Sequence, residues 1–296
     1  MIYGNVGLAR PGGRARSRGT APHLLLLLCL SSTLPAQDPT PNSQDPIFVC
    51  PMDPDVRSKG PGKCPRCGMS LEARLPPLAE YPVQMRYQKG EIRLRVLDPA
   101  TRRPVRHFEI IHEKPFHLFV VSQDLKFFAH DHPQPAGPGA FRLKLPLPQP
   151  GLYRLLGDFY PAGGAPQMVP LTLLTGPPAA KPVLQRDVSP KQATNLQVEL
   201  TTEPPEPIAG KKTLLFFRLK PADGLEQYLG AWGHLLTASD DLIDMIHTHP
   251  VIADGGDQVQ FNLIFPREAV YRIWVQFQRQ GQVNTAVFTL PVSRLR

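Results

Sequence analysis

HLFVVSQDLKFFAHDHP at residues 117–133 recurs as HLLTASDDLIDMIHTHP at residues 234–250. Both segments follow the pattern H-x12-H-x-H-P, and the second lies 117 positions after the first. Further downstream, Tyr153 matches Tyr271 at an offset of 118. A period of this length is longer than that of solenoid repeats, so the sequence predicts two similar domains in tandem.

Short alternating segments indicate that both copies are built from β-strands. Apolar and polar side chains alternate in residues 91–97, 141–145 and 271–277. Proline contributes 36 of the 296 residues, a density that breaks long helices and suits turns and strand edges. We therefore predict a mostly β chain with two antiparallel β-sandwiches, at residues 76–178 and 179–296.

The segment before Tyr153 adds detail to this fold prediction. Its P-x-P-G-x-Y pattern resembles the tyrosine-bearing strand entry of immunoglobulin-like domains. The resemblance implies that the two repeats are immunoglobulin-like sandwiches.

Six of the nine histidines belong to the duplicated pattern, three in each copy: His117, His130, His132, His234, His247 and His249. Residues two apart in a strand project from the same face, so His130 and His132 are expected to face one ion. An antiparallel neighbour would bring His117 beside them. Three imidazoles on a rigid sheet predict a Cu(II) or Zn(II) site in each repeat.

A structural explanation of the same pattern stays open. His-x-His-Pro also suits a corner in which the imidazoles bond to the backbone or to the neighbouring serine–aspartate pairs. Those pairs are Ser122 with Asp124 and Ser239 with Asp241. Clustered histidines are therefore candidates for metal ligands rather than proof of them.

Three cysteines gather in residues 47–75. Cys64 and Cys67 form a C-x-x-C turn, which directs two sulfurs at one centre, and Cys50 adds a third. Soft thiolate and thioether ligands favour zinc or Cu(I) over magnesium or calcium. The alternative is a disulfide with one thiol left over, in a segment too small to bury a core of its own. We predict a metal-binding module.

The runs FVCPMDP (residues 48–54) and GPGKCPRCGMSLE (residues 60–72) resemble the small heavy-metal-binding domain. That domain occurs beside copper-transporting ATPases and in periplasmic adaptors of copper and silver efflux pumps. The resemblance implies a soft-metal role for the three cysteines, with Met52 and Met69 as candidate thioether ligands. Many members have histidine where this chain has Asp53, which leaves the fourth ligand open.

The N-terminal residues are typical of export. Residues 1–36 combine a basic stretch, an apolar run and small residues before Ala36, as a secretory signal peptide does. A lipoprotein signal with Cys29 as the lipidated residue is the weaker alternative, and a true start after Met1 is another. Residues 37–46 are polar and proline-rich, which predicts a linker. No later stretch is a transmembrane candidate, so we expect a periplasmic or secreted protein.

The predicted function is that of an exported protein that sequesters copper or a similar soft metal, or hands it to a transport or efflux protein. We expect no enzymatic activity, because no motif pairs a nucleophile with a base. The net charge of +8 includes four arginines within residues 1–36 and no arginine–aromatic stripe follows, so nucleic acid is not an expected partner. The alternatives are an interaction module with a structural metal and a metal-dependent redox enzyme.

Overall fold

A computed structural model describes residues 47–52, 56–74 and 79–295. The predicted signal peptide, Cys29, the linker at residues 37–46 and Asp53 lie outside the described residues. Every regular element of the described part is a β-strand, which confirms the predicted fold class. Within those same residues, no helix has the length and apolar character needed to cross a membrane.

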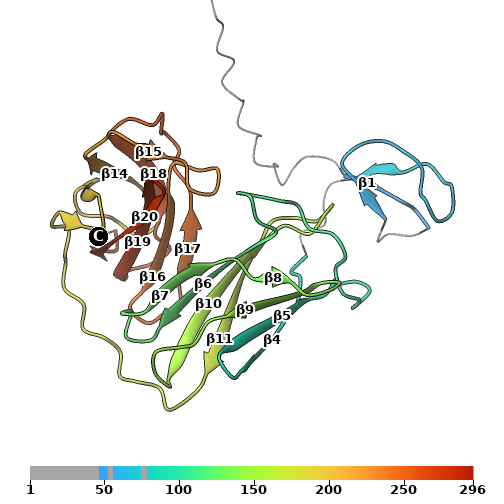
Figure 1. The fold of residues 1–296 in the computed structure, drawn as a ribbon, viewed down its shortest axis with the longest axis horizontal. Coiled ribbons are helices and arrows are strands. Elements are labelled where there is room, and N and C mark those ends of the chain that lie inside the picture. The colour runs from blue at the N-terminus through green and yellow to red at the C-terminus, as the bar shows by residue number, and fades with distance from the viewer. Residues whose placement is uncertain (1–46, 53–55, 75–78, 296) are drawn as a thin grey trace, which may run out of the picture. The chain divides into compact units, whose positions relative to one another are not determined.

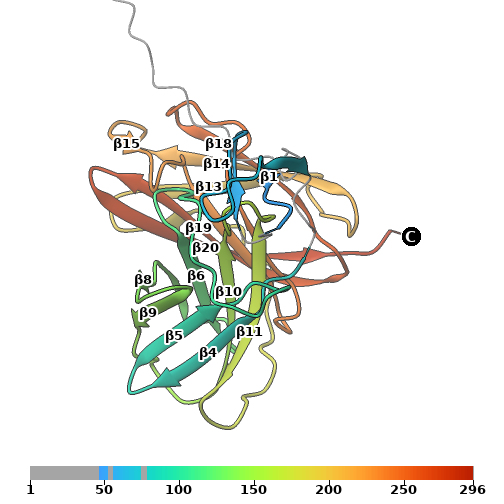
Figure 2. The same ribbon diagram turned by 90° about the vertical axis from the view of Figure 1, so that its right-hand side faces the viewer.

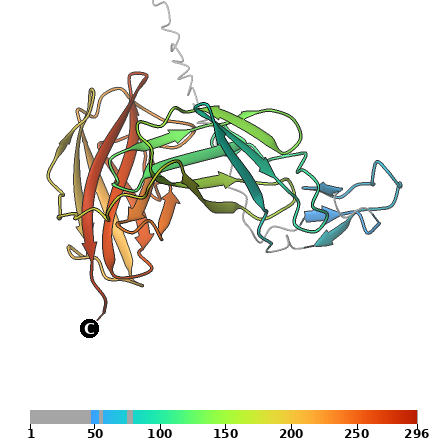
Figure 3. The same cartoon turned by 90° about the horizontal axis from the view of Figure 1, so that it is seen from below.

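The cysteine module is a three-stranded antiparallel sheet in the order β2-β1-β3, drawn in blue in Figure 3. Its strands are β1 (Ile47–Val49), β2 (Arg57–Ser58) and β3 (Glu72–Arg74). Arg57 joins the module to the first repeat, since its guanidinium donates to the Tyr81 hydroxyl at 2.7 Å and lies 3.5 Å from the Asp98 carboxylate.

The first repeat contains two antiparallel sheets, in the orders β4-β5-β9-β8 and β11-β10-β6-β7 (Figure 1). The first sheet comprises β4 (Val83–Gln88), β5 (Glu91–Val96), β8 (Gln134–Pro135) and β9 (Ala140–Lys144). The second comprises β6 (Phe116–Ser122), β7 (Phe128–Asp131), β10 (Leu152–Phe159) and β11 (Gln167–Leu174). Alternate residues of both sheets meet in one core, including Ile92 and Leu94 from β5 and Leu118 and Val120 from β6.

The second repeat has the same two-sheet plan (Figure 2). One sheet comprises β12 (Lys191–Gln192), β13 (Gln197–Glu203), β14 (Lys212–Lys220) and β18 (Gln258–Ile264). The other comprises β15 (Leu225–Glu226), β16 (His234–Ser239), β17 (Met245–Thr248), β19 (Ala269–Arg279) and β20 (Gln282–Val292). The hairpins β6–β7 and β16–β17 have one register, with Phe119 opposite His130 and Leu236 opposite His247.

The plan that the two repeats share includes an equivalent tyrosine in each. Tyr153 donates its hydroxyl hydrogen to the Gln149 carbonyl at 2.6 Å. The Tyr271 hydroxyl lies 2.9 Å from the Asp244 carboxylate and 3.2 Å from the Arg267 carbonyl. The Gln149 and Arg267 carbonyls each lie four residues upstream of their tyrosine, as in the tyrosine corner of immunoglobulin-like sandwiches. The immunoglobulin-like fold predicted from this segment is confirmed, whereas the predicted domain boundaries stay predictions.

A third apolar cluster lies between the two repeats. Its buried members from the first repeat are Phe119, Val121, Leu125 and Leu156, and those from the second are Leu236, Ala238, Leu242 and Trp274. Trp274 stacks on Phe128 with 5.2 Å between ring centroids. Strands β6 and β16 are therefore buried on both faces, since one face enters the sandwich core and the other this cluster. This double burial explains why neither strand alternates in polarity.

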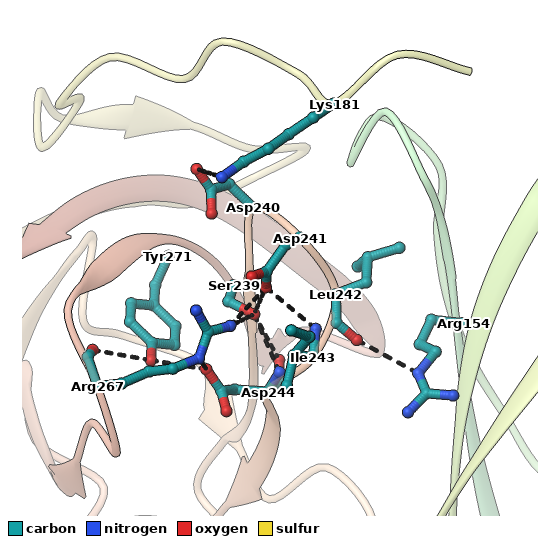
Figure 4. Close-up of polar contacts among 10 residues, drawn as sticks. All are labelled: Arg154, Lys181, Ser239, Asp240, Asp241, Leu242, Ile243, Asp244, Arg267 and Tyr271. Atoms are coloured by element: carbon teal, nitrogen blue, oxygen red, sulfur yellow. Dashed lines mark hydrogen bonds and ion pairs between the residues drawn. The ribbon is translucent and has the colours of Figure 1, made fainter. Parts of the chain in front are cut away.

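The serine–aspartate pairs hold turns rather than imidazoles. Ser239 donates to the Asp241 carboxylate at 2.7 Å, and Arg267 pairs with Asp241 and Asp244, at 2.5 and 2.8 Å (Figure 4). In the first repeat, Ser122 donates to Asp124 in the same way. The turns place two buried leucines, Leu125 and Leu242, in the left-handed region, at φ values of 57° and 59°. Arg154 crosses between repeats to donate to the Leu242 carbonyl at 3.2 Å.

The Arg267–Asp241 pair makes stability depend on pH in the acid range. Partial burial acts to raise the pKa of Asp241, but hydrogen bonds from Arg267 and Ser239 outweigh it and lower this pKa to about 2. An unfolded aspartate titrates near pH 3.9, so the stabilisation is complete above that pH and is lost as pH falls toward 2.

We therefore expect Asp241→Asn to destabilise the chain at pH 7 and to reduce the loss of unfolding free energy between pH 5 and pH 2.5. Urea unfolding at the two pH values measures this difference. Glu206→Gln, at an exposed position, serves as the matched control. A pH dependence that is the same in Asp241→Asn and the wild type would contradict the assignment.

Candidate metal centres

The three cysteines of the module converge on one point. Their sulfur atoms all lie within 4.8 Å of one another, and the Sγ atoms of Cys50 and Cys67 are 3.4 Å apart. A disulfide requires about 2.05 Å, and no disulfide joins these three cysteines. Thiolates bound to one tetrahedral zinc, each about 2.3 Å from the ion, lie about 3.8 Å apart. The spacing thus fits a shared ion better than a disulfide.

Backbone hydrogen bonds shape the C-x-x-C turn. The Gly68 amide donates to the Cys64 carbonyl at 2.9 Å, and the Cys64 amide donates to the Met69 carbonyl at 2.8 Å. Gly68 has a φ of +74°, a conformation that glycine adopts without strain. The turn keeps Cys64 buried, together with Cys50, and leaves Cys67 exposed.

The methionines lie at the surface of the module. The side chains of Met52 and Met69 are 69% and 44% exposed, respectively. An exposed thioether can contact an ion only from the solvent side of a site. Their assignment as ligands stays a prediction.

The proximity of the thiols affects the pKa of Cys67. A backbone hydrogen bond at Met69 acts to lower the pKa of Cys67, but the neighbouring Cys50 thiol, desolvation and the Cys64 thiol outweigh it and raise this pKa to about 11. Without metal, Cys67 therefore keeps its proton at neutral pH, and an ion that binds there must displace it.

The first histidine triad assembles at the end of the β6–β7 hairpin. His117 stands at the start of β6, His130 lies in β7, and His132 follows β7. Their ligand atoms lie within 4.8 Å of one another, with 3.2 Å between Nδ1 of His117 and Nε2 of His130. Imidazole nitrogens bound to one tetrahedral zinc are about 3.3 Å apart, since each lies about 2.0–2.1 Å from the ion. The triad therefore has the spacing of a metal site.

Hydrogen bonds fix which nitrogens of this triad carry hydrogen. Nε2 of His117 lies 3.0 Å from the Ile111 carbonyl, which can only accept. Nδ1 of His130 donates to Oε1 of Gln276 at 2.7 Å, because the Gln276 amide nitrogen donates to Thr285. Burial lowers the pKa of His117 to about 4 and that of His130 to about 2, so both rings are neutral at pH 7. Two lone pairs thus face each other, which a cation between them would relieve.

The second triad repeats this arrangement. Nε2 of His234 bonds to the Tyr228 carbonyl at 2.8 Å, so its Nδ1 faces Nε2 of His249 at 3.0 Å. Nδ1 of His247 lies 2.6 Å from the Asp158 carboxylate, an arrangement that in metal sites fixes the ring and strengthens it as a ligand. Burial lowers the pKa of both His234 and His249. The ligand atoms of all three lie within 4.8 Å of one another.

The histidines thus take up both kinds of role that the sequence allowed. One ring of each hairpin bonds to the backbone, as the structural alternative expects, yet its other nitrogen still points into the triad. Metal binding by the six residues stays a prediction. If the triads bind metal, the backbone hydrogen bonds of His117 and His234 would orient these two rings toward the ion.

Two residues near the triads, Asp158 and Gln276, could not be identified from the sequence pattern. Asp158 and Gln276 occupy equivalent positions, each opposite the first histidine of its own repeat. One is an acid and the other an amide, so no repeated residue type marks the two positions. Their separation of 118 residues, the same as that between Tyr153 and Tyr271, was the signal that could have linked them. His112 has no histidine counterpart, yet its ring centroid lies 3.8 Å from that of His249. His107 is exposed and lies in neither triad.

Comparisons with known proteins fit this description. Residues 47–74 match the heavy metal binding domain, which confirms the resemblance seen in the cysteine segment. The chain belongs to the family described as domain of unknown function DUF8832, which matches it twice, at residues 83–176 and 191–294.

Two curated relatives match short stretches of the chain. A copper-transporting P-type ATPase of Rhizobium leguminosarum bv. viciae is 45% identical over 49 residues, which are 16% of this chain and 6% of the relative. A silver exporting P-type ATPase of Salmonella typhimurium is 58% identical over 26 residues, 9% of this chain and 3% of the relative. The chain thus spans a small fraction of either relative.

Solved structures match the β-domains at low similarity. The FN1–FN3 domains of chicken CNTN1 are 9% identical with a TM-score of 0.22, covering 79% of this chain and 76% of that one. A two-domain fibronectin type III segment of chicken tenascin is 12% identical with a TM-score of 0.21, covering 71% and 97%. Scores this low support no inference beyond the fold already described.

The crowding of the thiols predicts an unusual reactivity. We expect iodoacetamide to modify Cys67 slowly at pH 8 despite its exposure, because its raised pKa leaves little thiolate. Cys50→Ser removes one neighbouring thiol, so the rate at Cys67 should rise. Mass spectrometry of the labelled peptides measures the rate at each cysteine.

Ser70→Ala provides a control that alters a neighbouring exposed residue and keeps all three thiols. One equivalent of Ag(I) should suppress labelling of the wild type. If Cys67 reacts at the rate of a free cysteine in a peptide, or if Cys50→Ser slows it, the crowded-thiol description is wrong.

Proposed function

We propose that this protein is an exported carrier that holds one soft heavy-metal ion on Cys50, Cys64 and Cys67 and passes it to another protein outside the cytoplasm. The main observation in support of this proposal is that three sulfur atoms lie within 4.8 Å of one another in a heavy metal binding domain. Binding and release suffice for this role, and we propose no catalytic step.

The burial of the ligands suits a carrier. Cys50 and Cys64 are buried and provide a fixed pair, whereas Cys67 is exposed at the surface of the module. Exchange between thiolates proceeds through a shared intermediate, so the incoming ligand must reach the ion. A site with one exposed thiol allows this approach, whereas a closed structural site does not.

Two observations support the choice of cargo. Thiolate ligands prefer soft ions, and two relatives that match short stretches of the chain are named for copper and silver. We therefore propose Cu(I), with Ag(I) as its chemical mimic, as the ion carried. The basic and apolar pattern of residues 1–36 supports a location outside the cytoplasm.

The test measures Ag(I) and Cu(I) bound to the full chain by plasma mass spectrometry, under reducing, anaerobic conditions. The triple variant Cys50/Cys64/Cys67→Ser should bind one ion fewer than the wild type. Cys67→Ser should keep the ion but lose it more than about tenfold more readily to a chelator, since loss of an outer partner alone weakens sites 10–100-fold. Ser70→Ala should behave as the wild type.

Transfer is measured separately, by mixing the loaded chain with an unrelated thiol-rich acceptor peptide. We expect the native, folded chain to release its ion within the mixing experiment. Equal stoichiometry in the wild type and the triple variant would contradict cysteine binding. An ion that leaves only when the chain unfolds would favour the structural-metal alternative over a carrier.

A further inference from the structure

The two histidine triads lie side by side. The rings of His130 and His234, from different repeats, have centroids 5.2 Å apart. The ring of His117 lies 6.2 Å from that of His234 and 6.3 Å from that of His247. The 5.2 Å separation is shorter than that within the first triad between His117 and His130, which is 5.5 Å, and the other two are less than 1 Å longer. The six rings therefore form one cluster rather than two separate sites.

Each repeat also provides a hydrogen-bond partner for a histidine of the other repeat. Asp158 of β10 bonds to His247 of the second repeat, and Gln276 of β19 bonds to His130 of the first. Because Asp158 and Gln276 are equivalent, this is one interaction used twice in opposite directions. Hydrogen bonds of this kind orient metal-binding histidines in known sites. Each triad takes its three histidines from its own repeat and one supporting hydrogen bond from the other.

Two buried ring nitrogens of the cluster have no hydrogen-bond partner among the described residues. They are Nε2 of His132 and Nε2 of His247, one in each triad. Native proteins rarely leave such groups unsatisfied, because losing water without a replacement bond is unfavourable. Phe119 stacks on His130 at 4.2 Å, so the apolar cluster between the repeats borders the site. An ion in each triad would satisfy these atoms.

We propose that the six histidines form a single dinuclear centre that binds two divalent transition-metal ions, Cu(II) or Zn(II), one per triad, and that its occupancy links the two repeats. The ligand atoms would be Nδ1 of the first histidine of each triad and Nε2 of the other two. This centre is separate from the thiol site and takes harder, imidazole-preferring ions.

The experiment uses the full chain with Cys50, Cys64 and Cys67 all changed to serine, so the result is independent of the proposed carrier function. Cu(II) is added, and unbound copper is removed by desalting. We expect two copper ions per chain by plasma mass spectrometry. Electron paramagnetic resonance should show spin–spin broadening and a half-field signal, because the two ions lie close together.

Single-triad variants separate the two ions. His117→Ala should leave at most one copper ion, with the narrower spectrum of an isolated Cu(II). His234→Ala should do the same for the other triad. His107→Ala is the matched control, since this exposed histidine lies in neither triad, and it should keep the coupled spectrum. Circular dichroism of each metal-free variant verifies its fold.

The crossed contact gives a sharper test. In the His117→Ala background, only the second triad binds, and Asp158→Asn should weaken its copper 10–100-fold although Asp158 belongs to the first repeat. In the His234→Ala background, the same substitution should leave the first triad unchanged.

Two outcomes would overturn the proposal. One is the binding of fewer than two ions by the cysteine-free chain. The other is a two-copper spectrum equal to the sum of the His117→Ala and His234→Ala spectra, because independent sites would give that sum. An Asp158→Asn effect that is equal in both backgrounds would show a general structural role and would also contradict the crossed assignment.

Discussion

The burial of β6 and β16 on both faces is the constraint on which the rest of this structure depends. One face of each strand completes the core of its own sandwich. The other face packs in the apolar cluster between the two repeats. Removing this apolar surface from water favours contact between the repeats. It also places the histidine at the start of each strand in a desolvated layer. Only neutral, bonded or metal-bound imidazoles are stable in such a place.

Duplication explains why the histidines support one another. Two copies of one domain that meet through equivalent faces make each contact twice, as in a symmetric dimer. The copies have since diverged at the supporting position, where one has Asp158 and the other Gln276. A carboxylate raises the donor strength of a bonded imidazole more than a neutral amide does. The two triads are therefore alike in shape and unequal in chemistry.

Much of this arrangement could be predicted from the sequence. The repeated H-x12-H-x-H-P was sufficient to bring three histidines together, because a hairpin of fixed register follows from the spacing. The C-x-x-C spacing likewise indicated the thiol cluster. The meeting of the triads was not predicted, since it depends on the outer faces of two sheets. The unbroken apolar run at residues 118–121 was the available signal, because a strand exposed on one face alternates.

Both hairpin turns contain a leucine in the left-handed backbone conformation, at equivalent positions of the two repeats. A non-glycine residue in this conformation is strained by about 1–2 kcal/mol, which glycine would avoid. Burying a leucine side chain returns about 1.5–3 kcal/mol, and Leu125 and Leu242 are both buried in the cluster between the repeats. In each turn, burial of the leucine against the other repeat therefore offsets the strain of the left-handed backbone. The two leucines therefore stabilise the joint between the two domains.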